Sequence, residues 1–273
     1  MDSSSGFRAG LARARGIALT QLPTVNRRLL KAEIFVVLGL SLGMSALYAY
    51  VDIVADLTRH VALNHQATGA LVGSHSSRPW VDLAYQILDV ISGVMPAALV
   101  VYLLFRSGES NRTIGLDGRQ PRFDISSGAL LAAVIGGAGL ALYLIAHALG
   151  IALTVVVSNL APVWWRDPIL VLSAAQNAIL EEVVVAAYLL HRLRQLGWSN
   201  NKALALSAGL RGSYHLYQGF GGFLGNAVLG VVFGWLYQRW GRVMPLIIAH
   251  TLIDAVAFVG YVELVGHVSW LPT

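Results

Sequence analysis

The sequence predicts an all-α membrane protein, a polytopic bundle of about seven transmembrane helices. The composition supports this class, because 56% of the 273 residues are apolar, only 12% are charged and the mean hydropathy is +0.64. Apolar runs of about 20 residues recur along the chain, and each is about as long as one bilayer crossing requires. We therefore expect a multi-pass protein of the cell membrane, with the lipid bilayer as a partner.

Seven apolar runs define the expected helices in chain order. The first run is too long and lies too late in the chain for a cleaved signal peptide, and the second contains Pro96 as an expected kink. The third exceeds one crossing, so we expect it to be tilted or extended. The expected spans cover residues 34–54, 81–105, 128–157, 169–190, 202–217, 221–240 and 244–265.

These helices divide the chain into an N-terminal group of three and a C-terminal group of four. The C-terminal group carries the polar motifs described below, so we expect any reactive site to lie there. The expected parts are a basic tail at 1–31, three helices with loops at 32–164, the four-helix core at 165–267 and a short tail at 268–273.

Basic residues predict the orientation of the bundle. Fifteen of the 19 lysine and arginine residues precede the first span or lie in the loops after the second, fourth and sixth spans. The positive-inside rule places these segments in the cytoplasm, so we expect a cytoplasmic N-terminus and a C-terminus outside. The net charge of +5 is thus a topology signal, and we expect no nucleic-acid partner. The absence of cysteine excludes disulfides, thiolate metal ligands and a cysteine nucleophile.

A pair of carboxylates, Glu181 and Glu182, interrupts the fourth run. A charge at membrane depth costs at least ~2.5–3.5 kcal/mol on insertion scales, so the pair requires a partner or a function. Neighbouring helical residues point about 100° apart, which predicts that the two cannot both face one site. Glu181 shares its face with Asn177 and is the candidate reactive carboxylate, whereas Glu182 is expected to bond to a neighbouring helix or to orient the site.

The three following helices also carry polar side chains at helical spacing. Arg211 and His215 are four apart on the fifth helix, and His250 and Asp254 are four apart on the seventh. On the sixth helix, Asn226 lies among glycines that allow close helix approach, and we expect it to hydrogen-bond across to another helix. Four consecutive helices thus turn polar side chains inward, which favours a reactive site.

Two kinds of chemistry suit this set of residues. A buried carboxylate can take a proton from water as a general base, while a histidine orients the water or stabilises an oxyanion. Alternatively, Glu181, His215 and His250 could bind a divalent metal that activates the water. The zinc signature His-Glu-x-x-His is absent, and spacing alone leaves both possibilities open. We expect no cofactor, with a divalent metal as the alternative.

These motifs resemble the CAAX-prenyl-protease and bacteriocin-processing (CPBP, or Abi) family of intramembrane proteases. That family's pattern is Glu-Glu-x-x-x-Arg, Phe-x-x-x-His and His-x-x-x-Asn/Asp, and the resemblance covers residues 165–262. It implies a glutamate-dependent endopeptidase that cleaves a membrane-associated or CAAX-like substrate, prenylated or not. In the same way it implies that Glu181 activates water, that His215 assists, and that His250 and Asp254 stabilise the oxyanion; Glu182 matches the second motif glutamate.

Two positions depart from the family pattern. The motif arginine is replaced by Ala186, and the phenylalanine of the second motif is replaced by Arg211. We hypothesise that Arg211 supplies the missing cation by a different route. The loss at Ala186 leaves the preference for CAAX substrates open. Intramembrane acids and histidines also mark ion paths, so a transporter and a non-proteolytic scaffold remain alternatives.

Overall fold

A computed structural model describes residues 26–272, and in this range the protein is a bundle of helices without strands. The α-helices are α2 (Arg27–Gly39), α3 (Leu42–Thr58), α4 (Pro79–Arg106), α5 (Pro121–Ala148), α6 (Arg166–Glu181), α7 (Leu190–Gln195), α8 (Asn200–Tyr214), α9 (Phe220–Trp240) and α10 (Met244–Leu264). Short 3-10 turns lie at η1 (Leu63–His65), η2 (Asn111–Ile114) and η4 (Leu216–Gln218). The predicted all-α class is confirmed. Most of the predicted basic tail, and the last residue of the chain, lie outside the described residues, and residues 27–31 belong to α2.

Five helical segments are long and apolar enough to cross a membrane, which supports a multi-pass protein. They are α4, α5, the continuous segment Arg166–Gln195, α9 and α10. Helices α2 and α3 meet at a bend of 50° and could form a sixth, broken span. Helix α8 has 15 residues, so at 1.5 Å per residue it extends only about 22 Å, short of a ~30 Å hydrocarbon core. The count of seven spans therefore stays a prediction.

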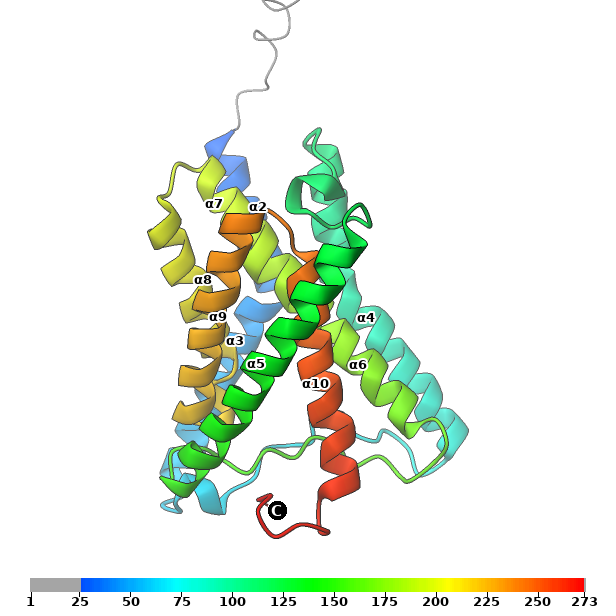
Figure 1. The fold of residues 1–273 in the computed structure, drawn as a ribbon. Helices are drawn as coiled ribbons and strands as arrows, with labels where there is room; N and C mark the ends of the chain where they lie inside the picture. The colour runs from blue at the N-terminus through cyan, green and yellow to red at the C-terminus, as the bar shows by residue number, and fades with distance from the viewer. Residues whose placement is uncertain (1–25, 273) are drawn as a thin grey trace, which may run out of the picture.

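If α2 is taken together with α3 and α6 together with α7, the helical segments run alternately up and down the bundle (Figure 1). Helix α2 begins at one end of the molecule and α10 finishes at the other, so an odd number of segments connects the two ends. Which of these ends faces the cytoplasm stays a prediction.

The third predicted span ends earlier than expected. Helix α5 stops at Ala148, and Gly150 follows with a positive φ of 72°. The following residues are extended, and their β-branched side chains favour that conformation. Two parallel bridges, Ala67 to Thr154 and Val72 to Ser158, join them to the segment after η1. The prediction that residues 128–157 form one membrane span is therefore wrong beyond residue 148.

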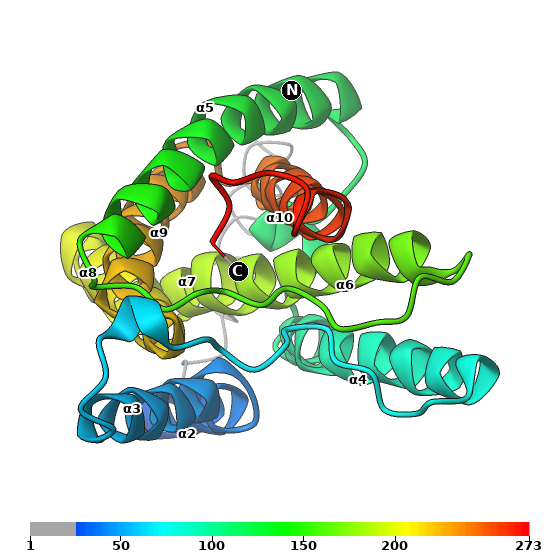
Figure 2. The same cartoon turned by 90° about the horizontal axis from the view of Figure 1, so that it is seen from below.

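We call these two paired segments, residues 66–73 and 150–158, the strap. They cross the same end of the bundle, side by side (Figure 2). The strap also bonds to the turn before α9, because the Leu153 amide donates to the Gln218 carbonyl at 3.1 Å. Gly219 in that turn has a φ of 90°, and a Cβ there would lie 2.8 Å from the Ile151 oxygen. Glycine is thus required where strap and turn meet.

A buried ion cluster holds the opposite end of the bundle. Arg192 on α7 is 1% exposed and pairs with Glu33 of α2 and with Glu109 of the loop after α4. His191 also bonds to Glu109. Partial burial raises the pKa of Glu109, but the hydrogen bond and charge of His191 and the charge of Arg192 outweigh burial and lower the pKa to about 2.

Candidate active site

The two glutamates lie at a change of helix type. Glu181 is the last residue of α6, and Glu182 begins η3 (Glu182–Leu189), a π-helical stretch whose eight residues are all buried. A π-helix displaces main-chain carbonyls from their usual partners and occurs often at functional sites. Here the Ser207 hydroxyl of α8 donates to the Val185 carbonyl at 2.9 Å. This hydrogen bond holds α8 against η3, next to the glutamate pair.

Arg211 on α8 links both carboxylates. Its Nη1 donates to Glu182 Oε1 at 2.7 Å, and its Nη2 lies 3.2 Å from Glu181 Oε2. The Arg211 side chain is 1% exposed, so this is a buried ion triad. The expectation that the two glutamates cannot share one site is wrong, because the long forked guanidinium spans the angle between them.

Helix packing makes room for this arginine. A Cβ at Gly230 of α9 would lie 3.2 Å from Arg211 Cδ, and the guanidinium lies over the Phe233 ring, 5.4 Å from its centroid. The predicted close approach along the α9 glycines is thus present at Gly230, where it borders the ion triad.

Glu181 has one oxygen held and one oxygen turned toward a histidine. The Tyr214 hydroxyl donates to Glu181 Oε2 at 2.9 Å, the same oxygen that Arg211 approaches. The other oxygen, Oε1, lies 3.9 Å from His215 Nε2. His215 Nδ1 donates to the Arg211 carbonyl at 3.0 Å, which leaves Nε2 of a neutral imidazole as an acceptor.

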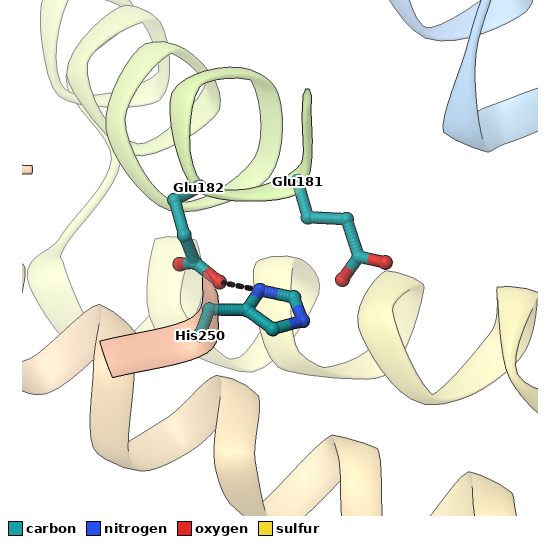
Figure 3. Close-up of side chains that lie close together, drawn as sticks. All are labelled: Glu181, Glu182 and His250. Atoms are coloured by element: carbon teal, nitrogen blue, oxygen red, sulfur yellow. Dashed lines mark hydrogen bonds and ion pairs between the residues drawn. The ribbon is translucent and has the colours of Figure 1, made fainter. Parts of the chain in front are cut away.

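Glu182 contacts the histidine of α10 (Figure 3). His250 Nδ1 lies 2.9 Å from Glu182 Oε1, and its Nε2 lies 3.3 Å from Asp254 Oδ2. The Asp254 side chain is 21% exposed, against 6% for His250 and 0% for Glu182. The exposure of these side chains therefore increases from Glu182 toward Asp254.

The structure brings together the two glutamates, the two histidines, Asp254 and Arg211, but it leaves the two predicted asparagines outside this network. Asn226 donates to the Gly222 carbonyl at 3.1 Å, one turn back in its own helix. The expectation that it bonds across to another helix is wrong, because the nearer carbonyl takes its donor. Asn177 lies one turn before Glu181 and lines a separate cavity with α4.

Tyr214 is a member of the site that sequence reasoning missed. It is 4% exposed and precedes His215 directly in the chain. On a helix, neighbouring residues point about 100° apart, so spacing gave no reason to place both beside Glu181. The only signal in the sequence is that Tyr214 lies inside the second motif, between its first position, Arg211, and its histidine, His215.

Three side chains lie close enough to hold a metal ion. One ligand atom from each of Glu181, Glu182 and His250 lies within 4.8 Å of the other two. The predicted set named His215 in place of Glu182. Carboxylate and imidazole are suitable zinc ligands. However, Arg211 already ion-pairs with both carboxylates, and a dication bound there would lie against its positive charge. The residue types fit a metal, but the position of Arg211 opposes one.

Comparison with known proteins agrees with the motifs. Residues 162–256 match the family described as type II CAAX prenyl endopeptidase Rce1-like. The matched stretch includes the glutamate pair, both histidines and Asp254. No curated protein and no solved structure matches the chain. The predicted resemblance is thereby confirmed for this stretch, and residues 162–256 are similar to the Rce1-like family of CAAX prenyl endopeptidases.

Proposed function

We propose that this protein is an intramembrane endopeptidase in which Glu181 activates the water that hydrolyses a peptide bond. The observation that carries this proposal is the pair formed by Glu181 Oε1 and His215 Nε2, two acceptors 3.9 Å apart. The other Glu181 oxygen is held by Tyr214 and Arg211, so a single oxygen is left to serve as the base.

A water between these acceptors would donate one hydrogen bond to Glu181 and one to His215. Its lone pair would then point away from both groups, toward the carbonyl carbon of a bound peptide. As the water attacks, Glu181 takes one of its protons, and the carbonyl oxygen becomes an oxyanion. Glu181 can later pass the proton to the leaving amine, so that protons balance over the cycle.

We assign stabilisation of the oxyanion to His250, whose ring Asp254 orients. His250 Nε2 faces the more exposed Asp254, so the donor on this nitrogen can be shared with a carbonyl oxygen that enters from that side. Glu182 Oε1 accepts hydrogen bonds from His250 Nδ1 and Arg211 Nη1, which orients both side chains. In this proposal Glu182 and Arg211 position other groups and do not contact the substrate.

The test is peptide-bond cleavage by the purified, detergent-solubilised protein against a mixed library of membrane and CAAX-like peptides. Loss of a general base lowers the rate by roughly 10²–10⁴-fold, so Glu181→Gln should abolish measurable cleavage. Glu263→Gln is the matched control, because its exposed carboxylate pairs with Arg166, away from the site. An intact library with the wild-type protein, or equal cleavage by Glu181→Gln, would contradict the proposal.

A metal-dependent version of the same peptidase is the second candidate, because Glu181, Glu182 and His250 are near enough to bind an ion. It predicts that a chelator abolishes cleavage by the wild-type protein and that added zinc restores it. The glutamate-only mechanism predicts cleavage that a chelator leaves unchanged. Ion flux altered by Glu181→Gln, without any cleavage, would favour a transporter, and neither effect would favour a scaffold.

We further propose that the protein lies in the cell membrane with its N-terminus in the cytoplasm and its C-terminus outside, as its basic loops indicate. The chain has no cysteine, so one introduced cysteine reports on one position. A membrane-impermeant thiol reagent added to whole cells should label His267→Cys and leave Gly118→Cys unlabelled. The opposite pattern would reverse the orientation. The substrate is then a membrane-associated peptide, prenylated or not.

A further inference from the structure

The strap has a free edge. On one side, residues 66–73 pair with residues 150–158: the Thr68 amide donates to the Thr154 carbonyl at 2.9 Å, and the Thr154 amide donates to the Gln66 carbonyl at 2.9 Å. The two bridges, at Ala67 and Val72, are isolated, and the residues between them are only partly paired. Within residues 26–272, the main-chain amides and carbonyls of Ala67, Gly69 and Ala70 have no hydrogen-bond partner. Such an edge can pair with another extended chain.

Two cavities lie along this edge. Residues 67–69 line a cavity of about 350 Å³ together with α3 and Tyr217, and residues 70–75 line a cavity of about 330 Å³ together with α4 and α6. Each cavity borders the candidate active site. The Tyr217 ring stacks on His215 with centroids 6.3 Å apart, and Asn177 of the second cavity lies one turn before Glu181. Each cavity thus has one lining residue next to a member of the Glu181 and His215 pair.

The second cavity contains polar side chains that lack partners. Ser173, Gln176 and Asn177 project from one face of α6 into this cavity, and in the described part of the chain their side chains form no hydrogen bond. A carboxamide offers one acceptor and two donors, which match the amide and carbonyl groups of a peptide main chain. This lining therefore suits an extended peptide better than a lipid tail.

The first cavity carries an excess of negative charge. Asp56 pairs with Arg59 at 3.3 Å, whereas Asp52 forms no ion pair among the described residues. One guanidinium thus faces two carboxylates. A peptide with a lysine or arginine side chain at this position would neutralise the excess charge.

We propose that residues 67–70 form the substrate-binding edge, along which an extended peptide pairs through its main chain and places a basic side chain in the first cavity, beside Asp52. The inference rests on the proposed peptidase function. It identifies the substrate as a peptide that binds in an extended conformation at the end of the bundle where the strap lies. The peptide main chain bonds to the free amides and carbonyls of the edge. Its side chains on the two sides of the scissile bond enter the two cavities.

The experiment measures binding separately from cleavage. Purified Glu181→Gln protein is incubated with the mixed peptide library, and the retained peptides are counted by mass spectrometry. Two further substitutions are compared in this background: Gly69→Pro removes the edge amide, and Gly69→Ala keeps it. A Cβ at Gly69 meets no atom within 4 Å, so alanine fits. One hydrogen bond contributes about 1 kcal/mol, so Gly69→Pro should retain about fivefold less peptide than Gly69→Ala.

Two additional measurements keep the test decisive if Gly69→Pro lowers the unfolding temperature. The best-retained peptide is N-methylated at each amide in turn, and we expect about fivefold weaker retention at alternate positions. Lysine and arginine should be enriched among the retained peptides, and Asp52→Asn should remove that enrichment.

The outcomes separate this inference from the proposed function. Equal retention by both Gly69 variants together with no effect of N-methylation would overturn the edge, and so would an absence of any retained peptide. Missing enrichment of basic residues would overturn the assignment of the Asp52 cavity. Retention that follows the expected pattern, without cleavage by the wild-type protein, would support the edge and refute the peptidase.

Discussion

Replacing Arg211 by methionine removes the cation that two buried carboxylates share. Methionine has a similar length and no charge, so the change leaves packing nearly intact and deletes the ion triad. Glu182 would keep only His250 as a partner, and Glu181 would keep only Tyr214 close to Oε2. The family motif arginine is absent at Ala186, so the described part of the chain offers no other arginine or lysine beside these carboxylates.

The expected cost follows from burial. The Arg211 side chain is 1% exposed and that of Glu182 is 0% exposed. Removing one partner of a buried ion pair costs about 3–5 kcal/mol, because the remaining charge loses its compensation. Near the melting temperature of a chain of this size, 1 kcal/mol corresponds to about 2–4 °C, so Arg211→Met should unfold roughly 6–20 °C below the wild type.

Thermal unfolding in detergent, followed by the fluorescence of the seven tryptophans, measures this difference. Arg239→Met is the matched control, since Arg239 is exposed and only lies over the Trp235 ring, 6.0 Å from its centroid. The control should change stability by less than about 1 kcal/mol. Equal unfolding temperatures for the two variants would refute the reasoning. Adding Glu182→Gln to Arg211→Met should recover part of the loss, because no uncompensated charge then remains on Glu182.

The hypothesis that Arg211 supplies the cation of the absent motif arginine can be tested by returning an arginine to position 186. Ala186 is 3% exposed and follows Glu182 by four residues, close to one turn of η3. We expect the double variant Ala186→Arg with Arg211→Phe, which restores the family pattern, to unfold at a higher temperature than Arg211→Phe alone. An unfolding temperature no higher than that of Arg211→Phe would show that position 186 cannot supply the cation in this chain.

Three further predictions use the same purified protein. Tyr214→Phe removes a donor to Glu181 and should lower kcat about tenfold with little change in KM, which peptide cleavage would show; an unchanged kcat would contradict this role. Glu109 has a pKa of about 2 when folded and near 4.5 when unfolded, so its stabilisation, at most about 3 kcal/mol, is complete above pH 4.5 and disappears as the pH falls to 2. Unfolding temperatures measured over that range should fall less steeply for Glu109→Gln than for the wild type, and parallel curves would refute the assignment. Gly219→Ala adds a Cβ 2.8 Å from the Ile151 oxygen at a φ of 90°, and should destabilise the protein by about 1–3 kcal/mol in the same unfolding assay; an unchanged unfolding temperature would contradict the close contact.

Hydropathy and residue spacing are local properties, and they predict much of this protein correctly. A bilayer requires long apolar helices, so the sequence alone indicates a multi-pass helical bundle. The glutamate pair and the two histidines can be recognised as site residues from the sequence. Residues three or four positions apart share one face of a helix, so the spacing of the polar residues shows which of them face the same way. The family match over residues 162–256 agrees with those motifs.

Contacts between segments distant in the chain depend on tertiary packing. Arg211 lies 29 positions from Glu182, and only the approach of α8 to η3 brings its guanidinium within 2.7 Å of that carboxylate. The strap required the end of α5 and the segment after η1 to meet, 85 or more residues apart, where main-chain pairing replaced the expected helix. Asn226 was expected to contact another helix, but its side-chain amide donates to a carbonyl in its own helix instead. Hydrogen bonds and ion pairs act over a few ångströms, so the partner of each polar group is decided by the folded arrangement of the helices.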